Sequence, residues 1–199
     1  VMYQGTDMRT GSALEIYRSG VGRCGEEAVF VVNVMRSAGI PARPVYVPRW
    51  SHCDDNHAWV EVWCDGDWHY LGACEPEAVL DKGWFTNAAS RAMMIGSRWY
   101  DRAMPDEKVI GKDGMNRIIN LLGKYAKTRW ITITVEDLDG TPAAGAKVRA
   151  EVMNYGEFSP IAIMEADKNG CISFETGFGS LLICAVYDGA YGEKVIDTR

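Results

Sequence analysis

The apolar pattern between Cys24 and Ala38 places the strongest limit on how this chain can fold. Apolar residues recur there at spacings of three and four, and Gly39 follows as a stop signal. The residues with this spacing are Ala28, Val31, Val32 and Met35. Val29, Phe30 and Val34 widen the stripe. We therefore expect a helix that begins at Cys24 and is buried on most sides.

Short extended segments follow this helix. Pro41 and Pro44 bracket a segment over residues 42–47, and alternating apolar residues over 57–64 predict a strand. Asp65-Gly66-Asp67 is a turn, and residues 68–71 form the returning strand. His57 would then lie at the open end of an antiparallel hairpin. A helix followed by antiparallel strands predicts an α+β fold.

The remainder of the chain divides near residues 127–129. Before that point we expect a loop over 1–20, a short helix over 88–95, a charged stretch over 101–113 and a helix over 115–125. After it, alternating residues broken by Gly-containing turns predict a small all-β sandwich. The predicted domains are therefore residues 1–127 and 128–199.

Charge and hydropathy exclude some classes of partner. The formal net charge of -6 gives no electrostatic reason for nucleic acid to bind. No apolar run approaches the roughly 18 residues that span a bilayer, so we expect no membrane insertion. The chain begins with Val1, so we expect a trimmed fragment whose compartment stays open, with secretion or the cell envelope favoured. Oligomeric state stays open too.

The cysteines do not indicate a disulfide framework or a metal site. There are six, and no two form a CxxC pair, so we expect mostly free thiols and no structural zinc. The loop from His52 to His57 contains metal-capable side chains without a repeated ligand spacing. We therefore read it as a surface loop and expect no cofactor or metal.

Cys24 and His57 are the candidate nucleophile and base. A cysteine in the first turn of a helix faces unpaired N–H groups and a partial positive charge, which favour the thiolate. Gly22 and Gly25 would leave room for a substrate. A lone cysteine is more often a small buried hydrophobe, and it is the later His57, after a polar loop, that favours thiol chemistry.

Three motifs resemble the transglutaminase-like superfamily. They are residues 22–28 (GRCGEEA), 39–43 (GIPAR) and 57–62 (HAWVEV). The resemblance implies a papain/transglutaminase-like core, in which a helix carrying the cysteine packs on an antiparallel sheet. It also implies Cys24 as nucleophile and His57 as base. The family's third triad member is an aspartate, but Gly72 stands at that position. Our candidate replacement is Glu75, with Asp55, Asn56 or a backbone carbonyl as alternatives.

Two further resemblances bear on the substrate. Residues 72–75 (GACE) and 82–84 (KGW) look like the peptide N-glycanase branch, although that branch's paired CxxC motifs are absent. Residues 140–148 and 167–170 resemble a carboxypeptidase-regulatory-like or transthyretin-like sandwich, which usually acts as a spacer or binding support.

The predicted function is cysteine-dependent acyl transfer. We expect hydrolysis of an amide bond through a Cys24 thioester, with a peptide, protein or glycopeptide as substrate. Two alternative activities are N-glycanase-like deglycosylation and transglutaminase cross-linking. A third alternative is an inactive module that binds peptide or glycan without turning it over.

Overall fold

A computed structural model describes residues 1–5, 10–100 and 108–199, and it separates into two compact units. Unit 1 contains residues 1–46 and 57–87, and unit 2 contains residues 47–56 and 88–199. Part of the loop predicted over 1–20 and part of the charged stretch predicted over 101–113 lie outside the described residues. The functional domain boundary at residues 127 and 128 stays a prediction.

The predicted fold class is wrong. Strands make up 45% of the structure and helices 15%, in several antiparallel sheets, so this is not the α+β papain-like core of a helix on a sheet. One reason is that residues 116–120, which lie inside the helix predicted over 115–125, form a strand. Their β-branched residues pair across a hairpin, and tertiary pairing of this kind overrides a helical reading of a short apolar pattern.

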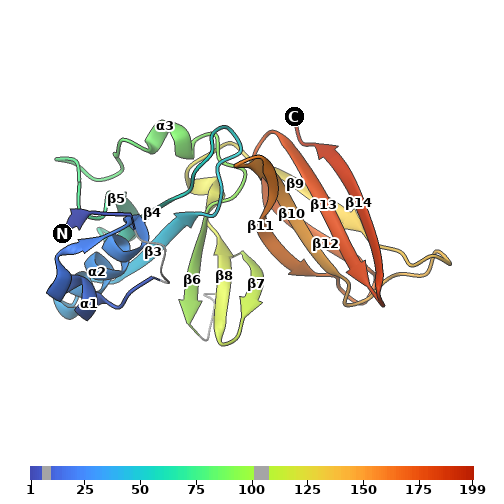
Figure 1. Ribbon diagram of the computed structural model, residues 1–199, viewed down its shortest axis with the longest axis horizontal. Coiled ribbons are helices and arrows are strands. Elements are labelled where there is room, and N and C mark those ends of the chain that lie inside the picture. Colours follow the sequence, from blue (N-terminus) through green and yellow to red (C-terminus); the bar gives the residue numbers. More distant parts are fainter. Residues whose placement is uncertain (6–9, 101–107) are drawn as a thin grey trace. The chain divides into compact units, whose positions relative to one another are not determined.

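Unit 1 is built around one long helix and three strands (Figure 1). The predicted helix and strands of this region form: α2 (Cys24–Ser37), β3 (Ala42–Val47), β4 (His57–Cys64) and β5 (Asp67–Leu71). The expectation that the helix is buried on most sides is wrong, since Val34 is 47% exposed. The strands lie in the order β5-β4-β3. The predicted N-terminal loop instead contains β1 (Met2–Tyr3) and α1 (Ala13–Ser19), and β1 pairs in parallel with β2 (Val21–Gly22). Ser12 begins α1 with a capping box closed by Glu15.

Apolar side chains fix α2 against β4. Ala28 and Val32 of the helix cluster with Val60 and Val62 of the strand. Val60 and Val62 both face this cluster because alternate residues of a strand point to the same side. Cys24 and His57 are therefore the first residues of two elements that pack together.

Unit 2 begins with short elements where helices were predicted. A single turn, α3 (Thr86–Ala89), spans the boundary between the units, and the predicted helix over 88–95 does not form. Strands β6 (Gly96–Tyr100), β7 (Val109–Asp113) and β8 (Asn116–Asn120) follow. They lie in the order β6-β8-β7, and the 3-10 turn η1 (Leu122–Lys124) comes after them. The helix predicted over 115–125 is thus replaced by a strand and a turn, because Gly114, at φ 58°, closes the β7–β8 hairpin.

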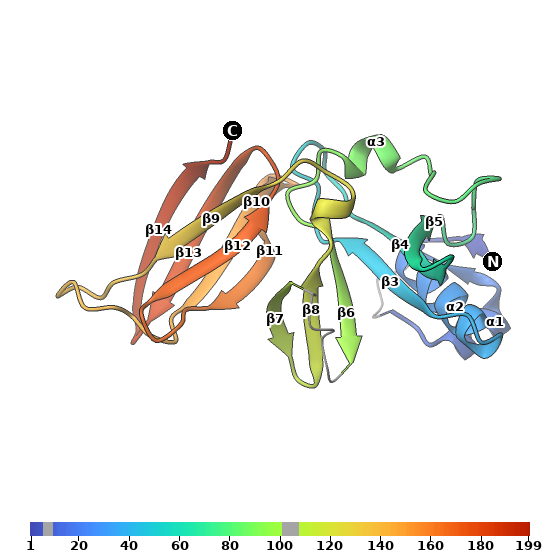
Figure 2. The ribbon, with the colours of Figure 1, turned by 180° about the vertical axis from the view of Figure 1, so that it is seen from behind.

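The C-terminal strands form two sheets (Figure 2). One has the order β11-β10-β13-β14 and the other pairs β12 with β9. The bounds are β9 (Arg129–Thr134), β10 (Lys147–Asn154), β11 (Glu157–Glu165), β12 (Cys171–Thr176), β13 (Ser180–Tyr187) and β14 (Ala190–Asp197). Ile172 and Phe174 of the two-stranded sheet share one core with Val148 and Leu181 of the other. This arrangement fits a β-sandwich.

The loop over residues 50–55 is held by one asparagine of β10. The Nδ2 of Asn154 donates to the backbone oxygens of Trp50 (3.0 Å), Cys53 (3.0 Å) and Asp55 (3.2 Å). Asn154 is fully buried. Residues about a hundred positions apart in sequence therefore form one local structure, which no local sequence pattern indicates.

Candidate active site

Cys24 occupies the first position of α2. Arg23 precedes it in an extended conformation, and the backbone N–H of Arg23 donates to Oε2 of Glu26 at 2.8 Å. This bond satisfies one donor at the start of the helix, whereas the first-turn N–H groups that follow have no partner within a regular helix. The thiol of Cys24 is partly buried. A thiolate formed there lies at the positive end of the helix dipole.

Arg23 places a further positive charge beside this thiol. Its Nη2 lies 2.9 Å from Oε1 of Glu26. The hydrogen bond that the Arg23 guanidinium donates to Glu26 is the largest cause that raises the pKa of Arg23, and the negative charge of Cys24 also raises it. Because such coupling is mutual, the guanidinium stabilises the thiolate.

The two glycines beside Cys24 differ in role. A Cβ at Gly22 would lie 2.7 Å from Cβ of Glu26, so Gly22 is required for β2 to approach α2 rather than to leave space for a substrate. A Cβ at Gly25 would meet Oγ1 of Thr10 at 3.7 Å, an ordinary contact. Of the two, only Gly25 fits the predicted role of keeping the approach to Cys24 open.

His57 lies among three aromatic rings. Its residue surface is 8% exposed, and its ring centroid lies 4.6 Å from that of Trp84, 4.9 Å from that of Phe85 and 5.8 Å from that of Trp59. Aromatic faces attract a cationic imidazolium, while the burial of the ring opposes its charging. The rings also restrict the orientation of the imidazole.

The sequence did not single out Phe85, and Trp84 entered through the motif at residues 82–84. The signal that points to both is Gly83. A Cβ at that position would lie 2.6 Å from Cε1 of Phe85, so only glycine lets the Phe85 ring fold back toward its own backbone. Phe85 is fully buried as a result, and Trp84 remains 62% exposed.

Glu75, the predicted third member of the triad, contacts Trp84. Its Oε1 accepts a hydrogen bond from Nε1 of Trp84 at 2.7 Å. Glu75 is thereby connected to His57 through the indole, which is a different role from the direct contact that we predicted. At Gly72, a Cβ would lie 2.7 Å from the carbonyl oxygen of Glu75. The tight turn between them explains why no aspartate stands at position 72.

We expect Glu75 to act by orienting Trp84. Glu75→Ala and Trp84→Phe should then slow alkylation of Cys24 by similar factors, of up to about tenfold, and the double variant should be no slower than either single variant. Glu75→Gln serves as a control because its amide oxygen can still accept from the indole. Normal alkylation in Trp84→Phe together with slow alkylation in Glu75→Ala would instead indicate direct action of Glu75 on His57.

A second carboxyl near Glu75 was not predicted. Glu27 follows Cys24 by three residues and is 5% exposed. Burial raises the pKa of Glu27, and the charge of Glu75 raises it further. The pKa of the Cys74 thiol is also raised by burial and then by Glu27. Cys74 is therefore a poorer source of thiolate than an ordinary cysteine and a suitable comparison for Cys24.

The other candidates have structural partners. His69 lies 2.6 Å from Asp81, which raises the pKa of His69 through a hydrogen bond. The carbonyl of Asp55 accepts from Asn154, and its carboxylate accepts from the backbone N–H of Asn56. Across the described ranges, no group of three or more His, Cys, Asp or Glu side chains could hold a metal ion. None of the described helices is long and apolar enough to cross a membrane.

Comparison with known proteins gives a family match over part of the chain and distant similarity to solved structures. No curated protein matches the chain in sequence. A solved structure described as a streptococcal ancillary pilin aligns at 10% identity and a TM-score of 0.29, over 80% of this chain and 54% of the pilin chain. The chain thus spans about half of that structure, and a similarity this low carries no argument. Residues 1–73 match the transglutaminase-like superfamily, which supports the resemblance found in the motifs and is compatible with a cysteine-dependent enzyme.

Proposed function

We propose that this protein is an acyl-transfer enzyme in which Cys24 is the nucleophile and His57 is the base. The observation that carries the proposal is the position of Cys24, which begins α2 beside Arg23 while α2 packs on the strand that begins with His57. The family match over residues 1–73 supports it.

The proposed reaction is hydrolysis of an amide. The Cys24 thiolate attacks the carbonyl carbon, the C–N bond breaks, and the amine leaves with a proton from His57. The resulting thioester is then attacked by water, which passes a proton to His57, the C–S bond breaks, and the carboxylic acid leaves while the Cys24 thiolate and the protonated His57 are restored. N–H groups at the start of α2 would stabilise the oxyanion in both steps, an effect worth roughly 3 kcal/mol per donor.

Three activities share this chemistry, and they differ in the acyl donor and in the group that attacks the thioester. A water acceptor gives a peptidase or amidase, and a glycosylated asparagine as donor gives N-glycanase-like deglycosylation. An amine acceptor would give cross-linking. We favour water and a peptide or protein amide, because an acceptor amine needs a second binding site.

The test is the pH dependence of Cys24 alkylation by iodoacetamide, read by mass spectrometry on the Cys24 peptide. We expect fast alkylation well below pH 8 in the native protein, and a shifted or abolished profile in His57→Ala. Cys74 in the same samples serves as the internal control and should react slowly. Equal and slow alkylation of Cys24 in both proteins would overturn the proposal.

A second candidate function is binding without turnover. Trp84 is 62% exposed and its ring lies against His57, so it offers a surface on which a peptide or glycan could stack. A ligand that quenches tryptophan fluorescence in the native protein but not in Trp84→Phe, while Cys24 stays unreactive, would favour this candidate. Formation of a Cys24 thioester would exclude it.

A further inference from the structure

Unit 2 contains a large open cavity whose lining is unusual in charge. It measures about 1050 Å³, well above the few hundred Å³ that a small ligand needs. Its charged lining residues are Arg91, Lys124, Lys127 and Arg199, and none of its described lining residues is Asp or Glu. In the whole chain acidic residues outnumber Lys and Arg by 27 to 21. The cavity is therefore a local concentration of positive charge on an acidic protein.

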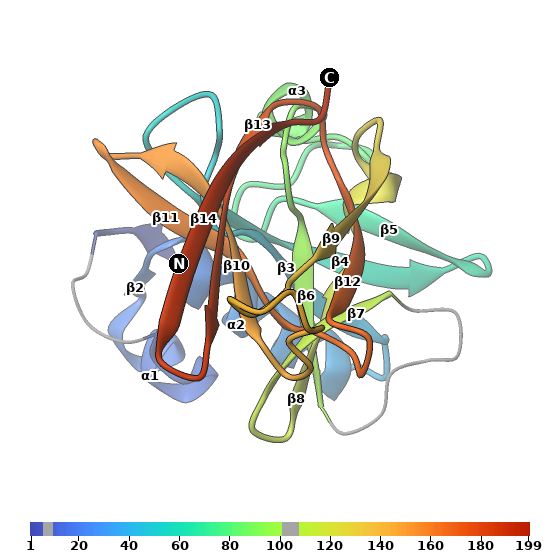
Figure 3. The ribbon, with the colours of Figure 1, turned by 90° about the vertical axis from the view of Figure 1, so that its right-hand side faces the viewer.

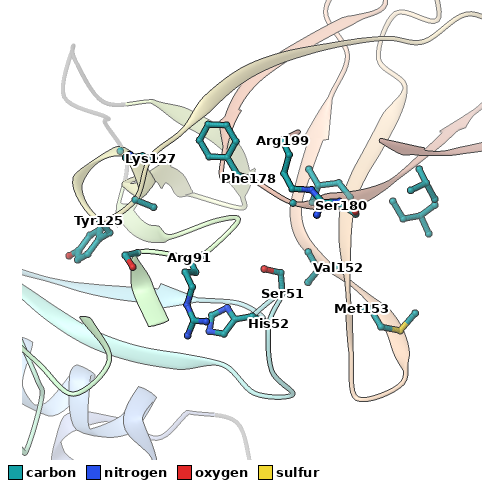
Figure 4. A pocket seen from close by; sticks show the side chains of 18 of the residues that line it. Ser51, His52, Arg91, Tyr125, Lys127, Val152, Met153, Phe178, Ser180 and Arg199 are labelled. Atoms are coloured by element: carbon teal, nitrogen blue, oxygen red, sulfur yellow. The ribbon is translucent and has the colours of Figure 1, made fainter. Parts of the chain in front are cut away.

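Two of these cations are available to a ligand. Within residues 1–5, 10–100 and 108–199, no carboxylate pairs with Arg91 or Lys127, and both side chains are exposed. Arg199, in contrast, is held by Asp197, with Nη2 2.9 Å from Oδ2. Figure 4 shows the Arg91 side chain beside the His52 ring. The pKa of His52 is lowered by partial burial and then by Arg91, which agrees with a positive potential in this part of the cavity.

The remaining lining combines apolar side chains with His52 and with serine and tyrosine hydroxyls, and its described residues include no amide or carboxylate side chain. Phe158, Phe178 and Val195 line the cavity and are 47%, 45% and 64% exposed, and Val152 and Leu182 form buried parts of the wall. The four cations of the described lining face no acidic side chain of the cavity, so a ligand with negative charge suits it better than a neutral one. Apolar side chains between free cations suit a peptide in which acidic and apolar residues alternate.

We propose that this cavity binds an acidic peptide segment that carries apolar side chains. Arg91 and Lys127 hold its carboxylates, and Phe178 contacts an apolar side chain of the segment. Attraction to exposed cations speeds encounter and weakens with salt, while the apolar contacts set how long the peptide stays bound. This binding does not depend on chemistry at Cys24, so a chain without that thiol binds the peptide equally well.

The experiment measures fluorescence anisotropy of labelled peptides with the full 199-residue chain. The probes are a hexapeptide that alternates glutamate with phenylalanine or leucine, the same peptide with glutamine in place of glutamate, and an oligoglutamate. We expect the alternating peptide to bind more tightly than the other two. The variant with both Arg91→Glu and Lys127→Glu should weaken its binding by roughly tenfold or more, and Phe178→Ala should weaken it without affecting oligoglutamate.

The matched control is Lys194→Glu. Lys194 precedes Val195 on β14, so its side chain points to the opposite face from the cavity, yet the change in net charge per residue is the same. Binding in this variant should stay within about twofold of the native value. Far-ultraviolet circular dichroism confirms that each variant is folded.

Three results would overturn the proposal. These are equal binding of the glutamine peptide, equal loss of binding in Lys194→Glu, and binding of a soluble polygalacturonate in place of the peptide. The last result would assign the cavity to an anionic polysaccharide. Because no step at Cys24 is involved, failure here would leave the proposed acyl transfer standing, and loss of Cys24 reactivity would leave the peptide binding standing.

Discussion

Replacing Cys24 with alanine is expected to reduce acyl transfer by roughly a thousandfold or more, because no other group can form the covalent intermediate. His57→Ala should reduce it by about a hundredfold or more, since a base and later acid is lost. The measurement uses p-nitrophenyl acetate as a general acyl donor. Release of p-nitrophenolate is followed at pH 7, and the acetylated peptide is identified by mass spectrometry.

Cys74→Ala is the matched control for this prediction. Cys74 lies in the same unit, and burial raises the pKa of its thiol, so its removal should leave turnover close to the native rate. Acetylation that persists in Cys24→Ala and disappears in Cys74→Ala would reverse the assignment of the nucleophile. If Cys24 becomes acetylated but the acetyl thioester is not hydrolysed, the protein carries out the first step of the reaction and not the attack by water.

Glu61→Ala is expected to destabilise the protein by about 3–5 kcal/mol, which is the usual cost of breaking a buried ion pair. Nε of Arg43 lies 2.6 Å from Oε2 of Glu61, and both residues are 1% exposed. The guanidinium of Arg43 also lies 4.2 Å from the centre of the Trp68 ring. Removing the carboxylate takes away the anion that pairs with this buried guanidinium. Urea denaturation followed by circular dichroism measures the loss.

The double variant Arg43→Met with Glu61→Leu separates the ion pair from the packing. It leaves no buried charge, so it should be markedly more stable than Glu61→Ala alone. If the two variants unfold at the same denaturant concentration, the cost comes from lost packing volume. The unpaired charge would then not be the cause.

Local patterns in the sequence were enough to predict α2 and the strands that follow it. The periodic apolar residues from Ala28 to Met35 define the buried face of the helix, and Gly39 marks its end. In β4 the alternate residues Ala58, Val60 and Val62 face the cluster with α2, because side chains two positions apart in a strand point to the same side. The positions of Cys24 and His57 at the starts of these elements follow directly.

The central strands could not be predicted in this way. In residues 116–120 (NRIIN), two adjacent isoleucines fit one face of a short helix as well as they fit a strand. What selects the strand is pairing with β6 and β7 on its two sides, which is a property of the folded chain (Figure 3). The hydrogen bond from Trp84 to Glu75 could not be predicted either, since it joins side chains nine positions apart in sequence.

The bonds made by Asn154 bear on whether the C-terminal strands are an interchangeable module. The resemblance to spacer-like sandwiches suggests a part that could be removed or exchanged at little cost. However, three backbone oxygens of the loop immediately before His57 accept from this one side chain of β10, and two of them also accept from backbone N–H groups of the loop itself. A chain shortened to residues 1–127 would lose the three bonds from Asn154, and any foreign domain would have to supply an amide at the same place to restore them. We therefore expect substitutions in the loop over residues 50–55 and at Asn154 to be accepted in evolution only as matched pairs.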